Sequence, residues 1–112
     1  MKTISFPRLP VVVSRYFEAA NRHDISATTG CFTRAAAVHD QFGCHEGRAA
    51  IRRWVRETTR KYGPTFVLLK PAATDAHVAV TVSVSGHFPG SPVQLTFHFR
   101  LQRRKIAALT IE

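Results

Sequence analysis

Residues 78–85 read Val-Ala-Val-Thr-Val-Ser-Val-Ser, an alternation of valine with small or polar residues. A period of two places the valines on one face of an extended strand and the smaller residues on the other. This stretch therefore predicts a half-buried β-strand. The turn-forming residues 86–92 (GHFPGSP) follow it, and residues 93–101 (VQLTFHFRL) repeat the alternation with larger apolar side chains. The two stretches predict an antiparallel pair of strands.

Two further stretches extend this sheet. Residues 65–70 are rich in β-forming residues, and residues 106–111 return the chain after a polar turn at 102–105. The chain from residue 65 to residue 112 thus predicts a β-meander.

The first half of the chain has helical periodicity instead. After Pro10, apolar side chains recur at the spacing of one helix face, at Val13, Tyr16, Phe17 and Ala20. Asp24 is a suitable N-cap for a short second helix, whose inward residues would be Ile25, Thr28 and Phe32. Gly47 and Gly63-Pro64 delimit a third helix over residues 48–62, with an apolar side formed by Ile51, Trp54, Val55 and Tyr62. Between the last two helices, residues 35–39 predict a short strand, and residues 40–43 a turn that precedes another short extended piece.

These elements predict one α+β domain over residues 1–112, in which three N-terminal helices fold over a curved, mainly antiparallel sheet. We expect residues 1–10 to form an N-terminal extension, residues 11–62 the helical half with short strands, and residues 65–112 the meander. A chain of 112 residues supports one core and one pocket rather than two independent sites.

The chain is basic, with 16 Lys and Arg against 7 Asp and Glu and a formal charge of +9. Such a charge attracts polyanions. Many of the cations, however, crowd the third predicted helix, at Arg48, Arg52, Arg53, Arg56, Arg60 and Lys61. No stacking aromatic residues are interleaved on this basic face as in single-strand readers, which favours a solvated helix face. We do not expect a nucleic-acid partner, and polyanion binding stays an alternative.

The sequence has no cofactor or metal signature. His39, His45, His87 and His98 match no recognised metal-ligand spacing, and no glycine-rich phosphate loop is present. Cys31 and Cys44 form no CxxC motif, so we expect two reduced, largely buried thiols in a cytoplasmic protein. The first ten residues lack the apolar run of a signal peptide, and no segment reaches the roughly 20 apolar residues of a membrane span. We therefore expect no membrane partner.

Three stretches resemble a known superfamily. Residues 15–25 (RYFEAANRHDI) resemble its first helix, and residues 38–43 (VHDQFG), followed by residues 46–51 (EGRAAI), resemble its strand, loop and next helix start. The superfamily is the nuclear-transport-factor-like one, which includes SnoaL-like polyketide cyclases and ketosteroid isomerases. The resemblance covers nearly the whole chain, although each motif is short. It implies a cone-shaped sheet wrapped around the three helices, a pocket for a small apolar ligand, and a homodimer.

The resemblance also implies a site. In ketosteroid isomerases, the residues that match Tyr16 and Asp40 are the tyrosine that stabilises an oxyanion and the carboxylate that moves a proton. Proton abstraction beside a carbonyl needs such a base and donor in a dry pocket. We expect Asp40 to be the base, Tyr16 the hydrogen-bond donor and Trp54 an apolar wall. The remaining pocket residues would be Phe32, His39, Phe66, Gln94 and Thr96.

The chain departs from this family pattern on the predicted strand 93–101. The isomerases carry a second acid there, whereas this region has none, so we expect His98 to be the second proton carrier. Which face of the strand lines the pocket stays open. If Gln94, Thr96 and His98 line it, then Val93, Leu95, Phe97 and Phe99 form an outer apolar stripe that predicts a sheet-to-sheet homodimer. If the aromatic residues face the helices, the cavity is more apolar and the argument for a dimer weakens.

The sequence leaves three functions open. The first is isomerisation, cyclisation or hydration of a ketone or polyketide-like ligand without a cofactor. The second is a non-catalytic ligand-binding or dimeric assembly domain, which the missing second acid favours. The third is polyanion binding through the basic third helix.

Overall fold

The computed structural model describes residues 9–73 and 77–112, which form three helices and six strands. The helices are α1 (Val11–Asn21), α2 (Ile25–Gly30) and α3 (Arg48–Tyr62). The strands are β1 (Phe32–Asp40), β2 (Gly43–Glu46), β3 (Thr65–Ala73), β4 (His77–Ser85), β5 (Val93–Gln102) and β6 (Lys105–Ile111). The predicted order of helices and strands agrees with this arrangement.

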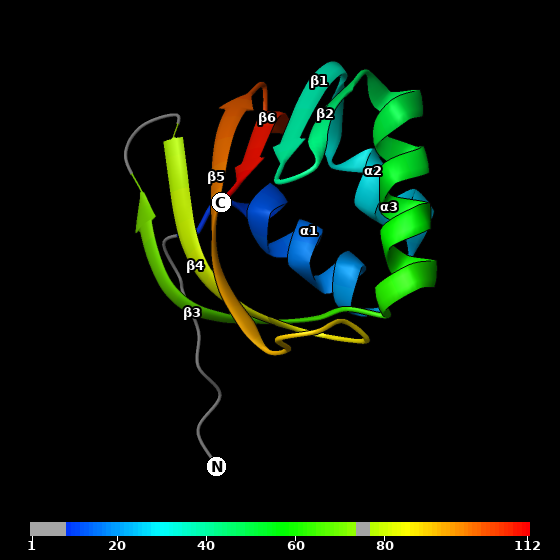
Figure 1. The fold of residues 1–112 in the computed structure, drawn as a ribbon. Coiled ribbons are helices and arrows are strands. Elements are labelled where there is room, and N and C mark those ends of the chain that lie inside the picture. The colour runs from blue at the N-terminus through cyan, green and yellow to red at the C-terminus, as the bar shows by residue number, and fades with distance from the viewer. Residues whose placement is uncertain (1–8, 74–76) are drawn as a thin grey trace.

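All six strands belong to one sheet in the order β2-β1-β6-β5-β4-β3. Every neighbouring pair is antiparallel except β1 and β6, which are parallel. The sheet curves without closing into a barrel, and α1 lies inside its curve while α3 closes the open side (Figure 1). The predicted α+β class, with a mixed, cone-shaped sheet wrapped around helices, is confirmed.

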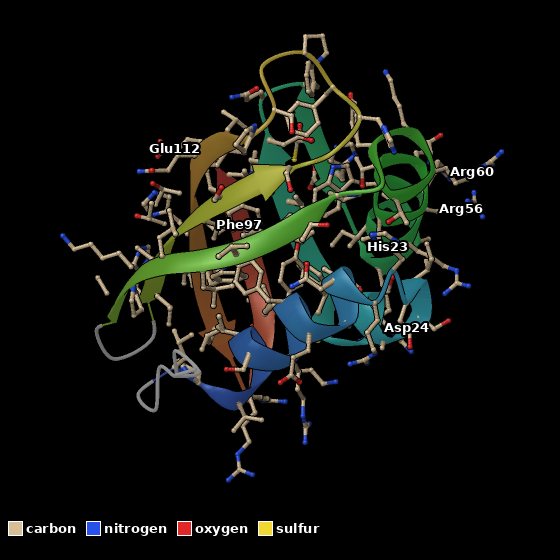
Figure 2. The ribbon with its side chains drawn as sticks, turned by 90° about the horizontal axis from the view of Figure 1, so that it is seen from below. His23, Asp24, Arg56, Arg60, Phe97 and Glu112 are labelled. Atoms are coloured by element: carbon tan, nitrogen blue, oxygen red, sulfur yellow. The ribbon has the colours of Figure 1, made fainter. Side chains whose placement is uncertain are left out.

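The core lies between α1 and the concave face of the sheet. Val78, Val80 and Val82 of β4 are completely buried, as the alternating pattern predicts. On β5 the aromatic residues face inward, and the Phe97 ring centroid lies 5.3 Å from that of Phe17 on α1. Figure 2 shows Phe97 between the sheet and α1. Of the two possible orientations of β5, the structure therefore has the one in which the aromatic residues face the helices.

The third helix begins and ends where its glycines predict. Gly47 precedes the first turn, and Gly63 follows the last with a positive φ of 52°, a conformation that glycine adopts readily. Two of the helix's arginines bind groups of the protein: Arg48 donates to the carbonyl of Phe32 at 2.6 Å and Arg52 to the hydroxyl of Ser26 at 3.3 Å. Arg56 and Arg60 point away from the sheet (Figure 2).

The loop between β4 and β5 folds against the end of α3. The backbone N–H of His87 donates to the carbonyl of Tyr62 at 2.8 Å, and the Phe88 ring meets the Tyr62 ring edge-on at 5.8 Å. Gly86 allows this approach, because a Cβ added there would lie 2.6 Å from the Tyr62 carbonyl oxygen. The loop therefore brings Phe88 over the space between α3 and the sheet.

Four expectations need correction or lie outside the described chain. The first strand begins at Phe32 rather than residue 35, so Phe32 belongs to β1 and not to the second helix. The strand predicted over residues 65–70 continues to Ala73. Cys31 is buried as expected, whereas Cys44 is exposed, and both thiols are free. Most of the expected N-terminal extension, residues 1–8, lies outside the described residues.

Candidate functional site

A cavity of about 580 Å³ lies between α1, α3, the β1–β2 hairpin and the concave side of β5. Its inner wall is apolar and is formed mainly by Tyr16, Val55, Phe66, Leu95, Phe97 and Ile111. Polar side chains gather on the β1–β2 hairpin and the adjoining face of α3, at Asp40, Gln41, His45, Glu57 and Lys61. An apolar cavity with a few grouped polar side chains is the usual form of a small-ligand site.

Asp40 ends β1, and the protein fixes the direction of its carboxylate. Its Oδ1 accepts hydrogen bonds from the backbone N–H groups of Phe42 at 2.9 Å and Gly43 at 3.0 Å. Its Oδ2 accepts one from the indole Nε1 of Trp54, also at 2.9 Å. The turn-forming character of Asp-Gln-Phe-Gly and the aromatic side of α3 thus meet at this carboxylate. Trp54, predicted as an apolar wall, is in addition a hydrogen-bond donor.

His45 on β2 is the second polar side chain beside Asp40. Its Nε2 lies 3.7 Å from Oδ2 of Asp40, and its ring stacks on the Trp54 indole at a centroid distance of 5.7 Å. Among residues 9–73 and 77–112, this Nε2 is the only buried side-chain nitrogen or oxygen that lacks a hydrogen-bond partner. Asp40, His45 and Trp54 therefore form one polar cluster at the cavity wall.

Tyr16 projects from α1 at the other side of the cavity. Its side chain is almost completely buried and packs edge-on against Phe32 at 5.8 Å and Phe99 at 5.6 Å. Burial, with a smaller contribution from the thiol of Cys31, raises the pKa of the Tyr16 phenol well above its ordinary value. The phenol therefore stays protonated and able to donate a hydrogen bond at neutral pH.

Four of the predicted site residues line this cavity: Tyr16, Asp40, Trp54 and Phe66. The placement of the other five is a correction. Phe32 is completely buried in the core behind Tyr16 and does not reach the cavity. His39 is exposed, because it alternates with the buried Val38 on β1.

Gln94, Thr96 and His98 are the other three, and they lie on the outer face of the sheet. They alternate along β5 with Leu95, Phe97 and Phe99, which face the core. The imidazole Nε2 of His98 lies 3.2 Å from a carboxylate oxygen of Glu112, whose side chain is 65% exposed. Figure 2 shows Glu112 on the side of the sheet away from α1. His98 therefore cannot be a proton carrier within this cavity.

His45 is the site residue that the sequence analysis missed. The hairpin pairs Val38 with His45 and Asp40 with Gly43. Residues that are paired across antiparallel strands share a face, so His45 shares the inward face of Val38. The signal was present in the two-residue turn Gln41-Phe42, which fixes this register.

The structure offers no arrangement for a bound metal among the parts of the chain that it describes, since no three His, Cys, Asp or Glu side chains are grouped to hold an ion there. Across the same described ranges, no helix is long and apolar enough to cross a membrane.

Comparison with known proteins agrees with the fold. The sequence model of the family described as the SnoaL-like domain matches residues 13–109 of this chain. The chain therefore belongs to the SnoaL-like family, within the nuclear-transport-factor-like fold. No curated protein matches the sequence.

Solved structures give the same result. A candidate polyketide cyclase from Sinorhizobium meliloti superimposes with a TM-score of 0.93 at 33% sequence identity, over 97% of this chain and 100% of that one. A protein with a ketosteroid isomerase-like fold from Catenulispora acidiphila, crystallised with trimethylamine, gives 0.81 at 19% identity, over 92% and 85% of the two chains. A nuclear-transport-factor-like protein of unknown function from Cytophaga hutchinsonii gives 0.80 at 16%, over 100% and 93%. The last two likenesses concern the fold alone.

Proposed function

We propose that this protein binds a small, mostly apolar ketone or polyketide-like ligand in its cavity and catalyses proton transfer at the carbon beside the carbonyl group, without a cofactor. The observation that carries the proposal is the presence of Asp40 and the Tyr16 hydroxyl in one apolar cavity of about 580 Å³. The likeness to a candidate polyketide cyclase at 33% identity supports the same substrate class.

In this proposal Asp40 is the base. Its carboxylate reaches the cavity while three hydrogen-bond donors hold its orientation. A base that is fixed in this way loses little conformational freedom when it meets the substrate. General bases in proteins contribute about 10²–10⁴-fold in rate, provided that they lie within hydrogen-bond reach of the proton.

Tyr16 is the donor to the oxyanion. Removal of a proton beside a carbonyl moves negative charge onto the carbonyl oxygen, and a hydrogen-bond donor already in place stabilises that charge most strongly where water is excluded. Among the described residues, no hydrogen bond engages the Tyr16 hydroxyl, so it is free to meet a ligand. The aromatic contacts of its ring with Phe17, Phe32, Phe97 and Phe99 fix its position.

Hydrogen–deuterium exchange tests the proposal without knowledge of the net reaction. Benzylacetone and a series of larger aryl and polycyclic ketones would be incubated with the protein in D₂O, and NMR would follow deuterium uptake beside the carbonyl. We expect the wild type to accelerate exchange, Asp40→Asn to lose about 10²–10⁴-fold of that rate, and Tyr16→Phe about 10²-fold or more. Exchange at the uncatalysed rate with every ketone would refute the proposal.

The hydrogen bonds of Asp40 also favour a second candidate, a non-catalytic ligand-binding domain. Both oxygens of the carboxylate already accept hydrogen bonds from the protein, which is the pattern of a structural turn. In that case ketones would quench or shift the fluorescence of Trp54 on binding, and Asp40→Asn would leave both binding and the background exchange rate unchanged. Exchange and fluorescence measured on the same samples therefore separate the two candidates.

A further inference from the structure

The cluster of His45, Asp40 and Trp54 contains more polar groups than a one-base mechanism uses. Asp40 and Tyr16 suffice to form and stabilise an enolate. His45 nevertheless places a buried nitrogen without a hydrogen-bond partner 3.7 Å from Oδ2 of Asp40. Buried polar atoms in native proteins are nearly always paired, and an exception at a cavity calls for an explanation.

We propose that His45 is the acid of the site and that the substrate class is a β-hydroxy ketone, which the protein dehydrates to a conjugated enone. The inference rests on the proton transfer by Asp40 proposed above and extends it. A ketone with a hydroxyl on its β-carbon can lose water after enolate formation, provided that an acid protonates the leaving oxygen. His45 is the polar side chain beside Asp40 whose ring nitrogen is able to carry that proton.

The step balances with the groups present. Asp40 takes the proton from the carbon between the carbonyl and the hydroxyl-bearing carbon, and the electron pair of that bond forms the enolate, which the Tyr16 hydroxyl stabilises. As the carbonyl re-forms, that electron pair makes the carbon–carbon double bond and the bond to the hydroxyl breaks. The leaving oxygen takes the Nε2 proton of the His45 imidazolium and departs as water.

The same geometry restores the site after each turnover. Asp40 finishes with an additional proton and His45 finishes as a neutral imidazole without its Nε2 proton. The two atoms face each other, so one transfer from Oδ2 to Nε2 returns both residues to their starting forms. The separation of 3.7 Å is longer than a hydrogen bond, but catalytic contacts are often long before a ligand binds and shorten in the complex.

Two neighbouring contacts fix the position of His45. Its ring stacks on Trp54 with an interplanar angle of 29°, and the same indole donates to the carboxylate oxygen that His45 faces. Because the base and the acid lie side by side, they reach the substrate from the same face of its carbon–carbon bond. The geometry therefore points to syn elimination of water.

The aldol adduct of acetone and benzaldehyde is a suitable probe, because its dehydration product, benzalacetone, absorbs strongly in the near ultraviolet. Benzylacetone, which lacks the hydroxyl, reports deuterium exchange alone. We expect the wild type to dehydrate the adduct. In His45→Gln, which keeps a similar shape but carries no exchangeable acid, dehydration should fall by about 100-fold or more, so that the ratio of dehydration to benzylacetone exchange falls with it.

His39→Gln is the matched control, since His39 is exposed on the neighbouring strand and outside the cavity. His39→Gln should retain the wild-type rates of both adduct dehydration and benzylacetone exchange. Thermal unfolding and Trp54 fluorescence would show that each variant is folded. If His45→Gln does not fold, His45→Ala with added imidazole replaces it, and recovery of dehydration with imidazole supports the acid role.

The possible outcomes separate this inference from the function on which it rests. Exchange of benzylacetone by a wild type that leaves the aldol adduct intact would overturn the dehydration and leave the proton transfer standing. Dehydration by His45→Gln at the wild-type rate, or anti loss of a stereospecific deuterium label, would remove His45 as the acid. No exchange of any ketone would overturn the proposed function and this inference together.

Discussion

The indole nitrogen of Trp54 donates a 2.9 Å hydrogen bond to Oδ2 of Asp40 and so joins the middle of α3 to the end of β1. The carboxylate side chain is only 14% exposed. Hydrogen bonds to charged groups that are shielded from water are among the stronger ones in proteins, because the charge has few other partners. One contact thus fixes both the docking of α3 and the direction of the proposed base.

Trp54→Phe should weaken the fold by removing this donor. A hydrogen bond to a charged group contributes about 1.5–3 kcal/mol, and we expect a loss of that size in the free energy of unfolding, measured with denaturant. A double-mutant cycle with Asp40→Ala isolates the pair, since both single variants also lose other contacts. Additive effects of the two substitutions would show that the indole and the carboxylate are not coupled.

Tyr16 gives the stability a dependence on alkaline pH. Burial raises the pKa of its phenol in the folded chain above the ordinary value of about 10. Above that pH the folded state holds a phenol proton that the unfolded state releases. The contribution of the Tyr16 phenol to the free energy of unfolding is therefore full below pH of about 10 and is lost as the pH rises further. Tyr16→Phe should therefore lose less stability than the wild type between neutral pH and pH of about 11.

A spectroscopic measurement checks the same point directly. The chain has two tyrosines, so Tyr62→Phe leaves Tyr16 alone. We expect no phenolate absorption from folded Tyr62→Phe near pH of about 10, where an unfolded tyrosine is about half ionised. Circular dichroism at each pH would show that the chain is still folded. Half-ionised Tyr16 in the folded protein would contradict the effect of burial.

Much of the fold was predictable because local patterns determine it. The alternating valines of residues 78–85 give β4, and Gly47 and Gly63 delimit α3. The parallel pairing of β1 with β6 joins segments about 70 residues apart, as in the partners Val38 and Leu109. No local pattern reports such a long-range contact, which explains why strand pairing was predictable only within the meander.

The site was predicted in part, and the three errors on β5 have one cause. The rule that apolar alternation faces the core would have placed Phe97 and Phe99 inward, as the structure does. The expected role of His98 as second proton carrier instead required the polar face of the strand to line the pocket. The sequence signal for His45 was a turn length rather than a motif, because its position depends on pairing with Val38 across the hairpin.

Gly86→Ala tests the packing of the β4–β5 loop on α3. The added methyl group would lie 2.6 Å from the carbonyl oxygen of Tyr62, so the loop or the helix end must move. Overpacking of this kind costs about 1–3 kcal/mol, and we expect that loss in thermal or denaturant unfolding. Gly30→Ala is the matched control, since a Cβ there meets no atom within 4 Å and should leave stability unchanged or slightly higher. Equal stability of the two variants would contradict the close contact.

We propose that two copies associate through the outer face of the sheet, as the family resemblance implies. Phe97 and Phe99 face the core, so this surface lacks the apolar stripe that it would have if these side chains pointed outward. It carries residues such as Thr96 and its register partner Thr81 instead, together with Val67 at 52% exposure. An interface of this composition should be weaker and dependent on concentration.

We expect sedimentation velocity to show a dimer that dissociates on dilution, and Thr96→Arg to be monomeric because its long cation would lie within the contact. Arg56→Ala, on the outer side of α3, should sediment as the wild type does, whereas a monomeric wild type at every concentration would exclude this dimer.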